Sequence, residues 1–398
     1  MRTPLMTLMA GATLLLSATA SYAADTLRPE VGKPLQEAQA DMKARKYSSA
    51  LADVDKAAAV GNLTEYESYI VAQMRAAIAT AAGDEKVAVS AYEKVIASSR
   101  TSAAQKLQIY DTIAKLAYSR RDYSTAAAYI RKYQAAGGSS AQTIDLLPQA
   151  LYLGNDLSGA KAALNAQIQN KKPTETQLQM LTSIAVKQKD DAGYIEALEK
   201  LVRYYPKKDY WLDLIARTTS KGTFASSRLQ LDVYRLKSMT GTMQKASDYM
   251  EAAQLALQEG LPGEAEQYVD AGYKAKLLGV GSDAARHKRL KDLVDKKVAE
   301  DKATMAQGDK AAAAQASGDA LVAAGLNHVG YGEAAAGVKM MEQGIKKDSL
   351  KNPNDAKLHL GYAQIKAGDK SGALRTLRSV GGSDGTADLS RLFALAAA

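Results

Sequence analysis

Small side chains recur about every 35 residues along this chain of 398 residues, and this period constrains the fold more than any other feature. Each of them follows a short break such as Gly83-Asp84, Arg121-Asp122 or Gly368-Asp369. The aligned positions hold Ala50, Ala88, Ala126, Ala160, Ile195, Ser227, Ala265, Ala334 and Ala373, with one double step before Ala334. A unit of this length has room for two helices but cannot bury its own apolar face, so we expect the units to stack on one another.

The segments between the breaks have the pattern of helices. Apolar residues recur at three and four positions, and no alternating strand pattern is sustained. Hydrophobic residues make up 46% of the chain, but large anchors are few, with 21 Tyr, 2 Phe and 1 Trp. Alanine lets two helices approach closely and is also the best helix former. The sequence therefore predicts an all-α fold of thin helical layers.

A second set of positions, in register with the first, carries a resemblance to a known family. Twelve residues before the aligned positions stand Ala38, Ala76, Ala114, Ala253 and Gly361, and three residues before them stand Tyr47, Tyr123 and Tyr331. This pattern resembles the tetratricopeptide repeat family, and among its members the exported bacterial proteins. The resemblance implies a right-handed α-solenoid, a superhelix of antiparallel helix pairs. For the three tyrosines, repeat position favours packing between helices over ligand binding.

The repeats divide the chain into four parts. Residues 1–23 form a leader, and residues 24–280 form an array of about seven helix pairs. The highly charged residues 281–316 interrupt the rhythm, either as a long helical segment or as an irregular repeat. Residues 317–398 form a pair of repeats closed by a capping helix that begins near Leu389.

The leader has the three regions of a Sec-type signal peptide. Met1-Arg2 gives a short positive start, Leu5 to Ala20 is uncharged and mostly apolar, and Ser21-Tyr22-Ala23 offers a cleavage site. The alternative is a retained anchor, but the apolar run is shorter than the roughly 20 residues of a spanning helix. The absence of cysteine excludes lipid attachment through an N-terminal cysteine, and it also excludes disulfides and a thiol nucleophile. We expect a soluble periplasmic protein that is not a lipoprotein and whose mature chain has no transmembrane segment.

Residues arranged for catalysis are not evident in the sequence. His287, His328 and His359 lie far apart, and none has a second histidine four residues away, as a zinc-binding helix would. A nucleophile elbow, a phosphate-binding loop and a dinucleotide fingerprint are all missing. We therefore expect no enzyme activity, no cofactor and no metal site.

The surface that the repeat geometry favours for binding is the face of the first helices, which lines the concave side of such a superhelix. Polar side chains and adaptable methionines dominate this face, as expected for contacts with protein segments. The candidate groove residues are Gln73, Asp111, Lys115, Tyr118, Gln177, Met180, Asp213, Met250 and Gln254. The resemblance implies a non-enzymatic scaffold or adaptor that holds a protein partner and supports an envelope assembly or secretion complex.

A net charge of +9 and a pI near 9.2 favour anionic neighbours and support a second interpretation. The protein would then be an accessory protein that binds an anionic cell-wall or exported polysaccharide, with Arg286, Lys288, Arg289 and Lys291 as candidate contacts. A solvent-exposed charged helix explains the same residues without a ligand. Nucleic acid does not fit the compartment, and no aromatic and basic stacking surface is evident.

Overall fold

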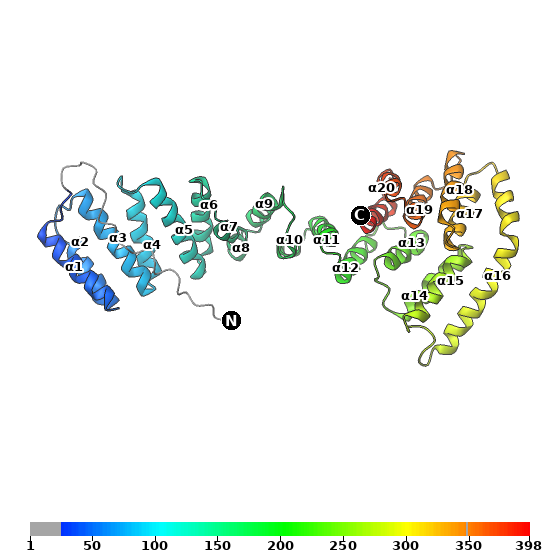
Figure 1. The fold of residues 1–398 in the computed structure, drawn as a ribbon, viewed down its shortest axis with the longest axis horizontal. Helices are drawn as coiled ribbons and strands as arrows, with labels where there is room; N and C mark the ends of the chain where they lie inside the picture. Colours follow the sequence, from blue (N-terminus) through cyan, green and yellow to red (C-terminus); the bar gives the residue numbers. More distant parts are fainter. Residues whose placement is uncertain (1–24, 348) are drawn as a thin grey trace. The chain divides into compact units, whose positions relative to one another are not determined.

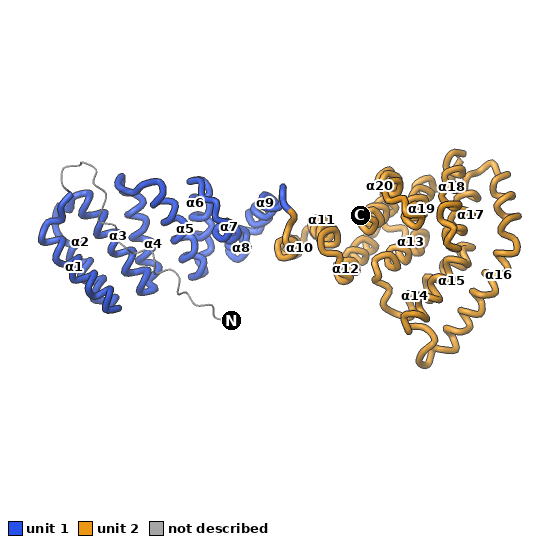
Figure 2. The backbone as a smooth tube through the Cα atoms, in the orientation of Figure 1, with its two compact units in different colours: residues 1–171 blue, residues 172–398 orange. Residues whose placement is uncertain are grey.

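The computed structural model describes residues 25–347 and 349–398, and the expected signal peptide lies outside these residues. The regular secondary structure that it describes is entirely helical. The chain divides into two compact units, unit 1 up to Lys171 and unit 2 from Lys172 (Figure 2).

Unit 1 is a stack of helix pairs (Figure 1). Its helices are α1 (Pro29–Lys43), α2 (Tyr47–Ala58), α3 (Glu65–Ala82), α4 (Glu85–Ala97), α5 (Ala103–Ser119), α6 (Tyr123–Ala135), α7 (Ala141–Ile144), α8 (Leu146–Leu153) and α9 (Leu157–Ile168). The pairs are α1 with α2, α3 with α4, α5 with α6 and α8 with α9, and each pair packs on the next through α2 and α3, α4 and α5, and α6 and α8. This sequential packing is that of an α-solenoid.

Unit 2 contains further helix pairs and two departures from the pattern. Its helices are α10 (Glu175–Gln188), α11 (Asp191–Tyr204), α12 (Lys208–Thr219), α13 (Ser226–Met239), α14 (Ala246–Gln258), α15 (Pro262–Lys274), α16 (Ala284–Ala314), α17 (Asp319–Gly330), α18 (Ala334–Lys346), α19 (Pro353–Lys366), α20 (Lys370–Arg378) and α21 (Thr386–Ala397). Pairs form between α10 and α11, α14 and α15, α17 and α18, and α19 and α20. In contrast, α12 packs on α11, while α13 packs on α14 and α21. The expected all-α class with stacked helix pairs is confirmed.

Five of the turns inside the described pairs share one geometry. Arg121 takes a positive φ of 66°, and the side chain of the following residue, Asp122, accepts a hydrogen bond from the Thr125 N–H at 3.2 Å. The left-handed residue ends one helix, and the aspartate caps the next by accepting from an otherwise unpaired backbone donor. The same combination occurs at Gly83-Asp84, Asn155-Asp156, Lys189-Asp190 and Gly368-Asp369.

The small repeat residues lie in the closest helix contacts. Ala38, Ala50, Ala76, Ala88, Ala114, Ala126, Ala253, Ala265, Gly361 and Ala373 are all buried. A Cβ added at Gly361 would lie 2.5 Å from a terminal methyl of Leu377, so a larger side chain there would require Leu377 to move. Tyr47 and Tyr123 are half-buried, and the ring of Tyr123 meets that of Tyr118 edge to face with centroids 5.6 Å apart.

The charged segment of the sequence forms one 31-residue helix, α16, which packs on α14, α15 and α17. The last helix, α21, buries Leu389, Leu392 and Phe393, packs on α19 and α20, and also contacts α11 and α13. The end of unit 2 therefore returns to its first half. The boundaries 24–280, 281–316 and 317–398 stay predictions of the repeat pattern.

Candidate functional site

Three of the predicted binding residues lie along one face of α5. Asp111, Lys115 and Tyr118 are spaced four and three residues apart, so their side chains project on the same side of the helix. All three are half-buried, and the Lys115 ammonium lies 2.7 Å from the Asp111 carboxylate. This face combines a paired charge with an aromatic hydroxyl.

Hydrogen bonds connect this face to the first helices of the next pair. The Tyr118 hydroxyl donates to Oε1 of Gln149 in α8 at 3.0 Å, and the Thr143 hydroxyl in α7 donates to the Asp111 carboxylate. Burial raises the pKa of Tyr118 above its usual value, with a smaller contribution from Tyr123, so its hydroxyl stays protonated and able to donate. Polar groups on successive first helices are thus held in fixed positions.

Gln73 occupies the corresponding place on α3, where its side chain is half-buried and its amide donates to the Tyr69 hydroxyl at 2.7 Å. We call Gln73, Asp111, Lys115, Tyr118 and Gln149 the first-helix face of unit 1. Gln149 was not among the sequence candidates. The repeat pattern contains a signal for it: Gln149 stands eleven residues before Ala160, as Lys115 stands eleven residues before Ala126.

The predicted residues of unit 2 do not form a comparable set. Gln177 completes a capping box with Thr174, and Met180 is half-buried. Asp213 accepts from the Tyr194 hydroxyl and lies 3.5 Å from Arg217. On α14, Met250 is buried and Gln254 is exposed. Three of these five residues are therefore used in capping, pairing or packing within the unit.

The basic residues at the start of α16 have mixed surroundings. Lys288 pairs with Asp292 at 2.7 Å, and Lys291 pairs with Asp295 at 3.1 Å. Arg286 and Arg289 are exposed, and neither forms an ion pair with another described residue. Between them His287 is buried, where its Nδ1 accepts from the Gly279 N–H at 3.1 Å. Binding of an anionic polymer here stays a prediction.

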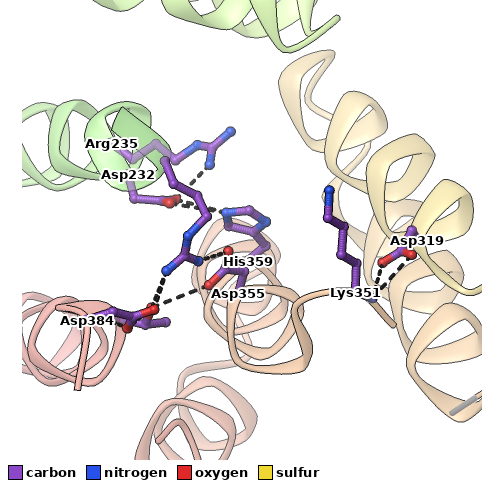
Figure 3. Close-up of polar contacts among 9 residues, drawn as sticks. Asp232, Arg235, Asp319, Lys351, Asp355, His359 and Asp384 are labelled. Atoms are coloured by element: carbon purple, nitrogen blue, oxygen red, sulfur yellow. Dashed lines mark hydrogen bonds and ion pairs between the residues drawn. The ribbon is translucent and has the colours of Figure 1, made fainter. Parts of the chain in front are cut away.

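A buried ion cluster that the sequence did not predict joins α13, α15 and α19. Figure 3 shows its members Asp232, Arg235 and His359. Arg235 donates to Glu264 at 2.7 and 2.9 Å and to Asp232 at 2.7 Å. Asp232 also lies 3.1 Å from Nε2 of His359, and the Tyr268 hydroxyl donates to Glu264 at 3.0 Å. No local motif indicates this cluster, because its members come from helices far apart in the sequence.

The charges within this cluster compensate one another. Burial opposes the ionised form of Asp232, but the charges and hydrogen bonds of His359 and Arg235 outweigh it and hold its pKa well below the usual value. At one side of the cluster, Arg228 donates to both Asp355 and Asp384. Since Asp232, Arg235 and Glu264 are buried, the arrangement is a joint between helices and offers no open face to a substrate.

Unit 2 also has a surface cavity of about 550 Å³ between α11, α12 and α21. Its charged groups compensate one another: Arg391 pairs with Glu199 and Asp388, and Lys221 pairs with Asp388. Its apolar lining comes from Ala192 and Ile195. The balance of charge selects no single class of ligand.

Among residues 25–347 and 349–398, no three His, Asp or Glu side chains are grouped so that they could hold a metal ion. None of the helices described combines the length and the apolar character that crossing a membrane requires.

Comparisons with known proteins give structural likenesses at low identity. No protein-family model matches the chain, and a search of curated proteins finds no match. The structure of Naa15/Naa10 bound to HypK-THB has 15% identity and a TM-score of 0.32, and the alignment covers 88% of this chain but only 58% of that one. Yeast Tom70 has 11% identity and a TM-score of 0.26, with 92% and 95% covered. The P58(IPK) TPR domain has 13% identity and a TM-score of 0.23, with 91% and 98% covered. These TM-scores are too low to carry an argument, and the description of an α-solenoid rests on this chain's own stacked helix pairs.

Proposed function

We propose that this protein is a non-enzymatic scaffold that binds a protein partner through the first-helix face of unit 1. The observation that carries the proposal is the pair of contacts that link α5 to the two helices after its pair, from Tyr118 to Gln149 of α8 and from Thr143 of α7 to Asp111. They hold polar groups in place before binding, which lowers the entropic cost of ordering an extended segment on this face.

We also propose that the protein acts in the bacterial periplasm, where it supports an envelope assembly or secretion complex. The apolar run from Leu5 to Ala20 and the small residues before Ala24 support export. Cell fractionation and the mass of the purified protein test this part. A mature chain that begins at Ala24 in the periplasmic fraction is expected, and a cytoplasmic chain that keeps Met1 would contradict it.

Crosslinking in the intact envelope tests partner binding. The test variant replaces Lys115, Tyr118 and Gln149, three residues of the first-helix face, with alanine. A matched control replaces Ser124, Arg131 and Gln134, three exposed residues on the outer side of α6, with alanine. The wild-type chain and the control should crosslink to the same protein, and the test variant should lose it.

Two results would contradict the proposal. One is that the wild-type chain captures no defined protein. The other is that the test variant keeps the partner at the wild-type level, which would place the binding surface elsewhere. Far-UV circular dichroism of both variants shows whether the helices are intact, so that loss of binding is not confused with loss of fold.

A further inference from the structure

The contacts that hold the long helix α16 against its neighbours differ along its length. Its first part buries Leu290, Val294 and Val298, and its end buries Ala312. Between Val298 and Ala312, however, every residue is exposed or half-buried. Apolar packing therefore holds the two ends of the helix, and residues 299–311 depend on polar contacts.

Two carboxylates of this segment provide contacts to α17. Asp301 accepts from the Asn327 side-chain amide at 2.8 Å and from the Tyr331 hydroxyl at 2.9 Å. Asp309 lies 3.0 Å from Nε2 of His328. The partners of both aspartates thus lie on α17 or on Tyr331, the residue that ends it.

His328 is buried and has a carboxylate at each ring nitrogen. Nε2 faces Asp309, and Nδ1 lies 2.5 Å from Glu333, at the start of α18. An imidazolium carries an N–H on both nitrogens and can donate to both carboxylates, whereas neutral imidazole has one N–H. After loss of the proton, one carboxylate faces a nitrogen lone pair, and that contact becomes repulsive.

Among the described residues, no cation lies in contact with His328. From α16 the facing groups are Asp309 and, one contact further away, Asp301, while Lys302 lies over the Tyr331 ring at 5.0 Å. From α18 the group is Glu333. On α15, Gln267 donates to the Gly330 carbonyl, and Glu264 accepts from Arg235. On α19, His359 is hydrogen-bonded to Asp232, and Asp355 accepts from Arg228.

We propose that His328 is a proton-dependent clamp: its protonated ring strengthens the attachment of residues 299–311 of α16 to α17. Deprotonation loosens this segment, which then keeps only the contacts of Asp301 to α17, while both ends of α16 stay packed. Burial lowers the pKa of His328, but the hydrogen bonds to Glu333 and Asp309 outweigh it and raise the pKa above the usual value. The clamp is then complete below the unfolded pKa of about 6.5 and is lost as pH rises through the folded pKa. This inference does not depend on the proposed protein-binding function.

Nuclear magnetic resonance of the full chain provides the direct measurement, because the chain has only three histidines. His328→Gln identifies the His328 signal, which should titrate above the usual histidine value. Asp309→Asn and Glu333→Gln should each lower this pKa, since each removes one of the charges that stabilise the imidazolium. A His328 signal that titrates at or below the usual value would overturn the proposal.

Hydrogen exchange, corrected for the intrinsic effect of pH, tests the structural consequence. The protection of amides in residues 299–311 should fall about tenfold as pH rises through the His328 pKa, as expected for loss of one charge-assisted hydrogen bond. Residues 287–298 are the internal control and should not change. In His328→Gln the pH dependence of residues 299–311 should disappear.

The proposal would be overturned if the amide protection of residues 299–311 in the wild-type chain did not change across the titration. It would also be overturned if residues 287–298 lost as much protection as residues 299–311. Trp211 fluorescence reports whether unit 2 of each variant is folded, since this single tryptophan is buried there. If His328→Gln does not fold, the Asp309→Asn variant is used instead, because asparagine keeps the shape of the aspartate side chain and removes its charge. A wild-type pH dependence in that variant would also overturn the proposal.

Discussion

Arg235 and Glu264 form a buried bidentate ion pair, in which Nε donates to Oε1 at 2.9 Å and Nη2 donates to Oε2 at 2.7 Å. The pair joins α13 to α15, and Asp232 extends it to His359 on α19. Three helices of unit 2 that are not consecutive in the chain are thereby fixed to one another.

Replacement of Arg235 by methionine should destabilise unit 2 by about 3–5 kcal/mol, because Asp232 and Glu264 would remain buried without their shared cation. Urea unfolding followed by Trp211 fluorescence measures the change. Arg286→Met, at an exposed position of α16, is the control and should leave the midpoint within error. An equal effect of both variants would mean that the buried pair is not what stabilises the unit.

Glu67 should make the stability of unit 1 sensitive to acid. The side chain of Arg28 donates to its carboxylate at 2.8 Å, the Thr64 N–H donates at 2.9 Å, and together they lower the pKa of Glu67 to about 2. Its stabilising effect is complete above the unfolded pKa of about 4.3 and is lost as pH falls towards 2.

Hydrogen exchange of the α3 amides measures this effect in the full chain. Glu67→Gln should reduce protection at neutral pH and flatten its decline below about pH 4.3, because the titrating group is gone. Glu37→Gln, at an exposed position of α1, should behave like the wild type. A decline of the same size in Glu67→Gln would assign the acid sensitivity to other groups.

The turn at Arg121 offers a stabilising substitution. A non-glycine residue with a φ of 66° carries a steric cost of about 1–2 kcal/mol, and glycine would remove it while losing about 0.5–1 kcal/mol of chain entropy. Arg121→Gly should therefore raise the stability of unit 1 by up to about 1 kcal/mol.

The opposite change can be made at an equivalent turn, where Gly83 has a φ of 73°. Gly83→Ala should lower the stability of unit 1. Thermal unfolding by circular dichroism measures both, and a destabilised Arg121→Gly would show that the arginine side chain contributes more than its strain costs.

Ala126 and Ala128 provide a matched test of close helix packing on α6. Ala126 is fully buried, whereas Ala128 is exposed on the same helix. Ala126→Leu should cost about 1–3 kcal/mol through overpacking, and Ala128→Leu should stay within about 0.5 kcal/mol of the wild type. Denaturant midpoints of the two variants make the comparison. Equal midpoints would show that the helices at Ala126 can separate without cost.

Much of the local architecture could be predicted from the sequence, because a helix pair is encoded within one repeat. The small residues at Ala114 and Ala126 mark where two helices come close, and Asp122 marks where the second helix starts. The pattern also indicated Asp111, Lys115 and Tyr118 as neighbours on one face. It could not indicate that Tyr118 donates to Gln149, since the offset between successive first helices depends on how the pairs pack.

The sequence by itself determined an all-α chain of stacked helix pairs, because period, helix propensity and turn chemistry act over short distances. Only the tertiary structure decided that α13 packs with α14 and α21, and that Asp232 meets His359, 127 residues away. The long helix α16 stands between α13 and α19 in the chain. A pattern that repeats every unit contains no information about which distant units meet, so the buried ion cluster and the His328 contacts appear only in three dimensions.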